Sequence, residues 1–468
     1  MNRSASENPI VAAWHQTFKR LGSAAAIRGS SGEVLRTFAQ IEKESSELEP
    51  LFAELPVCSA IGIQIGNSEC WPAVLLALFR CGLVPVPVGR HVESTELEGI
   101  LELCGTAALV TMAAGQLHVE RASRTSIRHD CDFLKLTSGT TSVPRAVRFR
   151  ARQLVADCTN ICETMGITER DLNFGVIPFS HSYGFSNLLT PLLCRGIPLV
   201  ATEDRMPRAI LHGLATSQAT VFPGMPVFYD KLAALESGTA LPELRLCISA
   251  GAPLPKAVAV AFSKRFGKKI HTFYGSSECG GIGYDASLEL HYDDGFAGTP
   301  MKNVEITPED GPENSGKIIV KGAAVADGYF PEEDADVLGN GRFVPGDLIC
   351  WRERGMFIAG RASDTINIAG RKLNPGEIEC RISTFPGVRQ VIVFGVPSPL
   401  RGEEPVACVA GEGIDRAALQ RFCQQQLSQW QVPRDFWLVE EIPANERGKI
   451  SRRVLSEEFL RKSSQGGR

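Results

Sequence analysis

From about Ala60 onward, short apolar runs alternate with amphipathic stretches, and this alternation limits the possible folds more than any other feature of the chain. It begins with AIGIQIGN, continues with WPAVLLALFRC at Trp71, and reaches AALVT at Ala107. Such a succession is typical of βαβ units, which build a mainly parallel sheet covered by helices. The segment 152–165 places its apolar residues on one helical face, and helix and strand alternate to about Glu278. We therefore predict an α/β fold with a large N-terminal domain.

The pattern of apolar runs and turn residues changes twice after this region. Between Gly295 and Gly360, strand runs such as GKIIVKG and FVPGDLICW are separated by turn residues, which predicts an antiparallel β subdomain. The residues that follow predict a short helix near Pro375, two strands, a helix over 416–429 and a last strand at Phe436. We expect an N-terminal domain over 1–361 and a small α+β C-terminal domain over 362–468, with a disordered polar tail after Lys462.

Composition excludes several classes of protein. A net charge of -4 gives no reason to expect nucleic acid as a partner. The 14 cysteines include no Cys-x-x-Cys pair and the 8 histidines no His-Glu-x-x-His motif, so we predict neither a disulfide framework nor a transition-metal site, and a reducing cytoplasm fits best. The N-terminus lacks a signal-peptide stretch, and the most apolar segment, 74–88, is interrupted by Arg80 and two prolines. We interpret that segment as a buried helix followed by a strand, without a transmembrane span.

The first chemical signal is LTSGTTSVPRAVRF, which begins at Leu136. A strand ends there in hydroxyl residues and one glycine before a second strand-like run begins. The backbone N–H groups of such a turn, together with the hydroxyls, form a concave set of donors suited to phosphate oxygens. Its residues are Thr137, Ser138, Gly139, Thr140 and Thr141, with Arg145 as the cation. Taken alone, the stretch fits an ordinary hydroxyl-rich hairpin equally well.

Four further motifs follow in order: HTFYGSSECGGIGYD at His271, FVPGDLICW at Phe343, GRASDTINIAGRKLNPGEIE at Gly360 and ERGKISRRVL at Glu446. Together with the first motif they resemble the adenylate-forming superfamily of acyl- and aryl-CoA synthetases, luciferases and peptide-synthetase adenylation domains. Acyl-CoA synthetases are the nearest branch, and IPFSHSYGF at Ile177 is most similar to fatty-acid-activating members. The resemblance implies ATP-dependent formation of an acyl-adenylate from a carboxylic acid, followed by transfer to a thiol.

The resemblance also implies a nucleotide site. The phosphate loop corresponds to 137–145, and Glu278 corresponds to the family's magnesium-associated glutamate, so ATP and Mg²⁺ are the expected cofactors. Tyr274 matches the aromatic residue that stacks on adenine, and Asp347 matches the acid that binds the ribose. The remaining matches in this site are Gly251, Ala252, Pro253, Gly275, Ser277 and Arg361.

In this family two half-reactions share one pocket, and the small domain rotates between them. Lys449 aligns with the lysine that reaches the reacting carboxylate and the α-phosphate, where a point cation stabilises developing negative charge. Gly370 and Lys372 belong to the loop that faces the thiol acceptor in the second step. The hinge position carries Ser363, and a small polar residue there can absorb the change in backbone angles. Taken alone, Lys449 would be interpreted as a solvated charge or as part of a phosphate site.

The acyl pocket is expected between 182–188 and 279–283, with Phe222, Gly224 and Met225 as further lining. Gly280 and Gly281 leave space that favours a medium or long fatty acid or an aryl acid over acetate. His181 matches a residue between this pocket and the thiol entrance, although capping or packing would explain it equally well.

The thiol acceptor stays open between free coenzyme A and the phosphopantetheine of an acyl carrier protein, because both present the same arm. Coenzyme A is favoured. A ligand-binding relative without catalysis is the third alternative, and the joint presence of Glu278, Asp347, Arg361 and Lys449 argues against it.

The phosphate loop departs from the family pattern at three positions. Ser142 and Ala146 stand where glycine is common, and Arg145 stands where lysine is common. Arginine holds its charge in a wider planar fork, and fewer glycines narrow the backbone angles available. We expect slower turnover or a more ordered loop. The pyrophosphate exchange rate of Arg145→Lys tests this, and unchanged kinetics would contradict it.

Overall fold

The computed structural model describes residues 7–122, 126–137, 145–290, 292–309, 315–398, 400–443 and 451–465. The chain divides into a large unit, residues 1–307 and 319–344, and a small unit, residues 308–318 and 345–468. The small unit defined in this way starts earlier than the predicted C-terminal domain. The functional boundary at residues 361 and 362 therefore stays a prediction.

A mainly parallel sheet runs through the large unit. Its parallel strands are, in spatial order, β1 (Ala25–Arg28), β10 (Leu199–Ala201), β9 (Asn173–Gly175), β11 (Val221–Gly224), β12 (Leu246–Ser249) and β13 (Ile270–Ser276). Antiparallel strands extend both edges, namely β2 (Val34–Thr37) beside β1, and β14 (Gly280–Tyr284) followed by β15 (Phe296–Pro300) beside β13. All residues of β11 and β12 are buried, as expected for strands covered on both faces. The α/β prediction is confirmed.

A second sheet of the large unit has the order β4 (Val84–Pro87), β3 (Ala60–Gln64), β5 (Ala108–Ala113) and β6 (Gln116–Arg121). The helices α3 (Trp71–Arg80) and α4 (Ser94–Leu103) connect its strands, and α2 (Phe38–Phe52) packs against α3. Every residue of α3 except Arg80 is buried, because this helix is apolar on all sides. The interpretation of the most apolar segment as a buried helix followed by a strand is thus confirmed.

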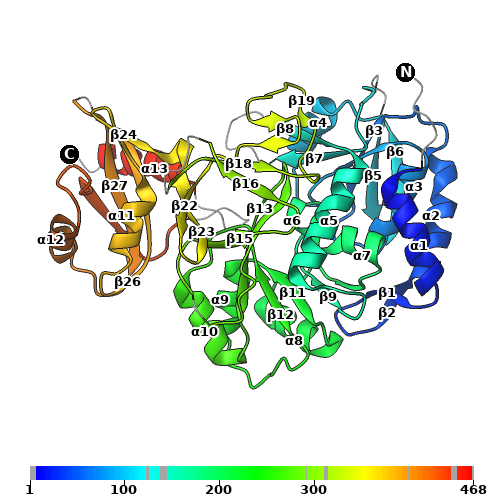
Figure 1. The fold of residues 1–468 in the computed structure, drawn as a ribbon, viewed down its shortest axis with the longest axis horizontal. Helices are drawn as coiled ribbons and strands as arrows, with labels where there is room; N and C mark the ends of the chain where they lie inside the picture. Colours follow the sequence, from blue (N-terminus) through cyan, green and yellow to red (C-terminus); the bar gives the residue numbers. More distant parts are fainter. Residues whose placement is uncertain are drawn as a thin grey trace. The chain divides into compact units, whose positions relative to one another are not determined.

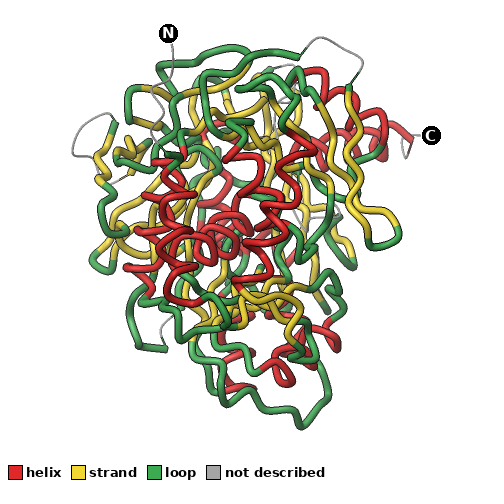
Figure 2. Tube along the Cα trace, turned by 90° about the vertical axis from the view of Figure 1, so that its right-hand side faces the viewer, coloured by secondary structure: helices red, strands yellow, loops and turns green. Residues whose placement is uncertain are grey.

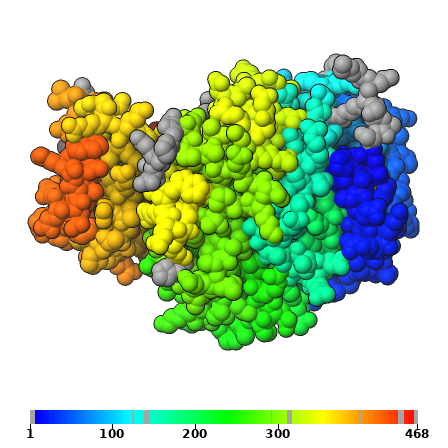
Figure 3. Space-filling view, viewed as in Figure 1, coloured from blue at the N-terminus to red at the C-terminus, as the bar shows by residue number. Residues whose placement is uncertain are grey.

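Helices cover the main sheet on both faces. α1 (Pro9–Leu21), α5 (Ala151–Met165) and α7 (Thr190–Arg195) pack together on one face, whereas α8 (Pro207–Ser217), α9 (Pro226–Ala234) and α10 (Lys256–Phe266) lie beside β11 and β12 (Figure 1). Seen from the side of α1, the helices of the large unit gather in front of the strands (Figure 2). The residues of α1, dark blue, form one continuous surface on the large unit in Figure 3. The core of the sheet is therefore enclosed.

A small three-stranded sheet carries the ends of the predicted phosphate loop. It consists of β7 (Phe133–Thr137), β8 (Arg145–Phe149) and β19 (Gly328–Phe330), all antiparallel. Thr137 pairs with Arg145, so the two ends of the loop are fixed beside each other. A neighbouring antiparallel group contains β16 (Glu305–Pro308), β18 (Ile318–Lys321), β21 (Arg342–Phe343) and β20 (Leu338–Gly339). This group forms part of the predicted antiparallel region.

The small unit contains two groups of strands. β17 (Ser315–Gly316), β22 (Asp347–Arg352) and β23 (Gly355–Arg361) are antiparallel, and a second sheet has the order β25 (Arg371–Leu373), β24 (Ile366–Ile368), β27 (Gly402–Gly411) and β26 (Val388–Ser398), with β28 (Asp435–Val439) parallel to β27. The helices are α11 (Pro375–Ile382), α12 (Arg416–Gln426) and α13 (Arg452–Gln465). The predicted α+β unit is confirmed. The prediction of a disordered tail after Lys462 was wrong in part, since α13 continues to Gln465.

α13 is attached to the small unit by an arginine near its start. Arg452 Nη2 lies 2.8 Å and 3.0 Å from the two carboxylate oxygens of Glu379, and Arg452 Nε donates to the carbonyl oxygen of Val393 at 3.0 Å. Arg452 also pairs with Asp364, which follows the predicted hinge residue Ser363. The Arg452 side chain is only 25% exposed, so these contacts are partly shielded from water.

Replacing Arg452 with methionine is expected to destabilise the small unit by about 2 kcal/mol, because two half-buried carboxylates lose their cation. Urea unfolding, read by hydrogen exchange in β26 and β27, measures the change. Arg453→Met is the matched control, because the Arg453 side chain is 76% exposed and, among the described residues, its ion pair is with Glu457 in its own helix. Its expected cost is below about 0.5 kcal/mol. Equal effects of the two substitutions would contradict the assignment.

All fourteen cysteines are free thiols in the structure. Several are deeply buried, and burial raises the pKa of the Cys247 thiol to about 12. A thiol with such a pKa stays protonated near neutral pH and is a poor nucleophile. Among the described residues, none of the helices combines the length and the apolar character needed to traverse a bilayer.

Candidate active site

Residues predicted for the nucleotide site and for the acyl pocket meet at the carboxyl edge of the main sheet. Gly224 is the last residue of β11, the stretch 251–253 follows β12, and Tyr274 lies near the end of β13. Neighbouring parallel strands β11, β12 and β13 deliver these residues to one side of the large unit. Ligands of open α/β sheets bind in the crevice outside such strand ends. Gly251, Ala252 and Pro253 are exposed there, whereas Tyr274 is 8% exposed.

Glu278 lies in the turn between β13 and β14, and three contacts fix it. The Tyr329 hydroxyl donates to Glu278 Oε1 at 3.0 Å, and the Ser276 hydroxyl donates to Oε2. The N–H group of Ala326 donates to the backbone carbonyl of Glu278 at 2.9 Å. Burial raises the pKa of the Tyr329 phenol, and the charge of Glu278 raises it further. The phenol therefore remains a donor to the carboxylate.

The cation of the phosphate loop lies against the same tyrosine. The Arg145 guanidinium carbon is 5.6 Å from the centre of the Tyr329 ring, a cation–π geometry. Thr137 donates its hydroxyl to the Arg145 carbonyl at 3.1 Å, which ties the two ends of the loop. Ser138, Gly139, Thr140, Thr141 and Ser142 lie outside the described residues. Arg145, Tyr329 and Glu278 form a continuous group, named here the anion-side array.

His181 is the N-cap of α6 (Ser182–Gly184). Its Nδ1 accepts a hydrogen bond from the N–H of Tyr183 at 3.3 Å. This histidine therefore caps the helix, as one of its two interpretations expected. Because Nδ1 accepts, a neutral ring carries its proton on Nε2. The next residue, Ser182, donates its hydroxyl to Ser277 at 2.8 Å. This bond joins α6 to the turn that carries Glu278.

Two parts of the predicted acyl pocket prove to be closely packed. A Cβ on Gly280 would lie 2.0 Å from Asp157 Oδ1, and one on Gly281 would lie 2.5 Å from Met301 Sδ. The glycines are therefore explained by the side chains packed against them, and the inference that they leave open space is corrected. Phe222 is fully buried, with its ring 5.1 Å from that of Tyr229.

The predicted residues of the small unit fall in two places. Arg361 Nε donates to Asp347 Oδ1 at 3.2 Å across the paired strands β22 and β23. Gly370 and Lys372 belong to the exposed β24–β25 hairpin, in which Ala369 and Gly370 both have positive φ. That combination is typical of a type I′ turn. Lys449 lies outside the described residues.

Sequence reasoning missed two buried charged residues beside this site. Lys135, in β7, is 4% exposed, and Asp157, in α5, is 2% exposed. Asp157 Oδ1 accepts the N–H of Gly281 at 3.0 Å. Both residues could have been noticed in the sequence. Lys135 interrupts an apolar strand, and Asp157 lies on the apolar face of its helix beside Leu154 and Cys158.

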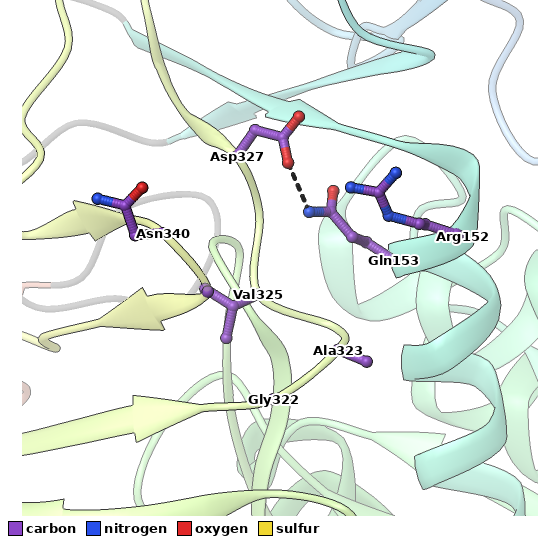
Figure 4. Close-up of a pocket in the computed structure, with 8 residues that line it drawn as sticks. Arg152, Gln153, Gly322, Ala323, Val325, Asp327 and Asn340 are labelled. Carbon is purple, nitrogen blue, oxygen red and sulfur yellow. Dashed lines mark hydrogen bonds between the residues drawn. The ribbon is translucent and has the colours of Figure 1, made fainter.

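A surface cavity of about 510 Å³ is lined by other residues (Figure 4). Its walls include Arg152 and Gln153 of α5 and the segment Gly322 to Asp327. Gln153 and Arg150 both donate to the Asp327 carboxylate at 2.7 Å, so the main acid of this cavity already serves to join α5 to that segment. None of the predicted site residues lines it.

Comparison with known proteins adds an independent line of support. The AMP-binding enzyme family matches residues 120–330, and the AMP-binding enzyme C-terminal domain matches residues 377–449. A long-chain-fatty-acid–CoA ligase of Bacillus subtilis is 30% identical over 349 residues, which are 70% of this chain and 62% of that protein. A feruloyl-CoA synthase of Amycolatopsis is 27% identical over 86% of this chain and 90% of its own length.

The fold also matches solved structures. ATP-bound MatB from Rhodopseudomonas palustris superposes with a TM-score of 0.83 at 24% identity, over 96% of this chain and 99% of that one. The two family matches follow the chain in the same order as the large and small units, and the curated relatives are CoA ligases. The chain therefore belongs to the AMP-binding enzymes of the adenylate-forming superfamily.

Proposed function

We propose that this protein uses ATP to convert a carboxylic acid to an acyl-adenylate, with release of pyrophosphate, and then transfers the acyl group to coenzyme A. The anion-side array is the observation that carries the proposal, because it places a cation over the ring and a carboxylate at the hydroxyl of one tyrosine, beside the strand pair that bounds the phosphate loop. Polyphosphate binding requires both a cation and an oxygen ligand for a metal ion.

Glu278 is the proposed ligand for Mg²⁺. Both of its oxygens accept hydroxyl hydrogen bonds, and each carboxylate oxygen has a second lone pair for a hard cation. When bound with the nucleotide, Mg²⁺ supplies neutralisation of phosphate charge. Thr137, Arg145 and the loop between them would hold the phosphate oxygens through hydroxyl, guanidinium and backbone donors.

The other proposed contacts of the nucleotide are inferred from the family resemblance. Tyr274 and the stretch 251–253 would flank adenine, with Gly275 and Ser277 beside them. In the small unit, the Asp347 carboxylate would accept from the ribose hydroxyls, and Arg361, which donates to Asp347, would orient that carboxylate and contact the nucleotide. These roles rest on the family resemblance together with the positions of the residues on their strands.

Two small-unit segments would serve the two half-reactions. Lys449 would stabilise the charge that builds on the carboxylate and the α-phosphate during adenylation. The hairpin that carries Gly370 and Lys372 would face the thiol during transfer, after rotation about Ser363. His181 would gate the path between the acyl pocket and the thiol, while its Nδ1 caps α6.

A fatty or aryl acid is the proposed substrate class, supported by relatives named for a long-chain fatty acid and for ferulic acid. The second candidate acceptor is the phosphopantetheine of an acyl carrier protein, whose thiol arm has the same chemistry. A catalytically weak ligand-binding relative is the remaining alternative.

AMP formation across fatty, aryl and short acids, each with and without coenzyme A, tests the proposal. The expected result is AMP release that requires both an acid and coenzyme A. Release that needs a carrier protein and ignores coenzyme A would favour the second acceptor. An absence of ATP–pyrophosphate exchange with every acid would refute adenylation.

Tyr329→Phe is expected to lower adenylation about 10-fold at limiting Mg²⁺, since a hydrogen bond to a charged group is lost while the ring under Arg145 is kept. Most of the loss should be recovered at saturating Mg²⁺, because the metal then orders Glu278 without the phenol. The Mg²⁺ dependence of pyrophosphate exchange measures both quantities. An unchanged half-saturating Mg²⁺ concentration would contradict the positioning role of Tyr329.

A further inference from the structure

One aspartate lies inside the segment that holds Glu278. Ala326 donates its N–H to the backbone carbonyl of Glu278 at 2.9 Å, and the Tyr329 hydroxyl donates to Glu278 Oε1 at 3.0 Å. Asp327 stands between these two residues in the chain, and its own N–H donates to the carbonyl of Arg148 in β8 at 2.9 Å. A displacement of Asp327 would therefore move both contacts of Glu278.

The Asp327 carboxylate is bound by the start of α5. Arg150 Nε donates to Oδ2 and Gln153 Nε2 donates to Oδ1, each at 2.7 Å. Gln153 is fixed in turn, because its Oε1 accepts the N–H of Arg150 at 2.7 Å and the residue is buried. A hydrogen bond between a guanidinium and a carboxylate belongs to the stronger class. Both oxygens of Asp327 are thus engaged by one end of a helix.

These bonds lie beside the surface cavity. Gln153 and Asp327 both line the cavity, and the bond between them joins α5 to the segment 322–327 (Figure 4). Because open volume borders the segment there, hydrogen bonds contribute more of its restraint on this face than packed side chains do. The position of the segment should therefore depend on the Asp327 carboxylate.

Arg150 also binds a second carboxylate, that of Asp130. Its Nη1 and Nη2 lie 3.0 Å and 2.9 Å from the two oxygens of Asp130. The Asp130 side chain is 85% exposed, whereas that of Asp327 is 29% exposed. Asp130 precedes β7, whereas Asp327 lies between the two residues that contact Glu278. The two carboxylates therefore share an arginine but belong to different segments.

We infer that Asp327 is a positioning residue for Glu278. Held by Arg150 and Gln153, it keeps the Tyr329 hydroxyl against the carboxylate that is proposed to bind Mg²⁺. Loss of a hydrogen bond that orients a metal ligand typically lowers metal affinity or activity by about 10- to 100-fold. Asp327 acts one step further out, through Tyr329, so the lower end of that range is expected. This inference rests on the proposed adenylation function.

Asp327→Asn tests the inference, because the amide keeps the size of the side chain but replaces an acceptor with a donor that faces Arg150 or Gln153. The half-saturating Mg²⁺ concentration of ATP–pyrophosphate exchange is expected to rise about 10-fold, with a rate at saturating Mg²⁺ within about two-fold of the wild type. Asp130→Asn is the matched control, since it removes a carboxylate from the same arginine and should change neither quantity. An unchanged Mg²⁺ dependence in Asp327→Asn would overturn the inference.

Hydrogen exchange in the nucleotide-free protein gives a readout that needs no turnover. The N–H of Ala326, which is bonded to the Glu278 carbonyl, should exchange at least about 10-fold faster in Asp327→Asn than in Asp130→Asn. Equal protection of this amide in the two variants would show that Asp327 does not order the segment, and the positioning role would be lost.

Gln153→Glu reaches the same contact from α5. The new carboxylate keeps an acceptor for the Arg150 N–H but places a like charge beside Asp327. It should raise the half-saturating Mg²⁺ concentration by a similar factor, and it decides the question if Asp327→Asn does not fold. A wild-type Mg²⁺ dependence in folded Gln153→Glu would count against the inference.

A double variant tests whether the effect passes through Tyr329. In the Tyr329→Phe background, Asp327→Asn should raise the half-saturating Mg²⁺ concentration by less than about three-fold, because the contact on which it acts is already absent. A full effect of about 10-fold in that background would exclude this route.

Failure of the proposed function would give a different result. A wild type that exchanges pyrophosphate with no acid would refute adenylation, and the inference would fall with it. An active wild type whose Mg²⁺ dependence is shared by Asp327→Asn would overturn only the role of Asp327.

Discussion

Lys449→Met lowers acyl-adenylate formation by about 10²–10³-fold, the effect expected when one preorganised donor to a developing oxyanion is removed. Three residues later in the sequence, Arg452 is bound to Asp364, Glu379 and the Val393 carbonyl, at the start of the described helix α13. Methionine retains the length of the side chain and removes only the charge.

The rate of ATP–pyrophosphate exchange measures this effect. Transfer from added acyl-adenylate to coenzyme A should be nearly unchanged in Lys449→Met, because the lysine is assigned to the first half-reaction only. Lys43→Met is the control for a loss of positive charge elsewhere. Exchange at the wild-type rate in Lys449→Met would refute the role of the lysine.

Glu278→Gln is expected to lower adenylation by at least about 10²-fold, since the amide is a much weaker ligand for Mg²⁺ than a carboxylate. The substitution keeps the shape of the side chain and an oxygen that can accept from Tyr329, so the fold of the turn should persist. Raising Mg²⁺ should restore only part of the rate. Exchange kinetics across a Mg²⁺ titration, with the melting temperature as a check on folding, provide the measurement.

The matched control is Glu169→Gln, on the surface, where Glu169 pairs with Arg20. It should behave as the wild type at every Mg²⁺ concentration. If Glu278→Gln kept its activity and its Mg²⁺ requirement, the metal would have to be held by other oxygens, and the assignment of Glu278 would fail.

Periodicity predicted the elements whose burial follows a simple rule. α3 is apolar on every side and α5 carries an apolar stripe, so both could be located from the sequence. α13 could not, because it is rich in charge and buries little beyond Leu455. Its attachment depends on Arg452 contacts with residues distant in the chain, and such contacts leave no local pattern.

The residues of the candidate site also differ in how well the sequence predicted them. The residues of the large unit were predicted from ordered motifs, and the strand order explains why 251–253 and Tyr274 share one edge. The pocket was predicted less well. Glycines at 280 and 281 suggested empty space, but Asp157 and Met301 occupy it. Lys135 and Asp157 each look like isolated charges in the sequence, and only tertiary packing joins them.

The pairing of β19 with β8 has a consequence for how the protein is made. Gly328 of β19 lies opposite Arg148 of β8. During synthesis, β8 therefore leaves the ribosome long before the strand with which it pairs. Until then β8 presents an open edge to other chains. Truncations that stop before residue 328 should consequently aggregate and depend on chaperones, whereas chains that extend past Phe330 should close this edge.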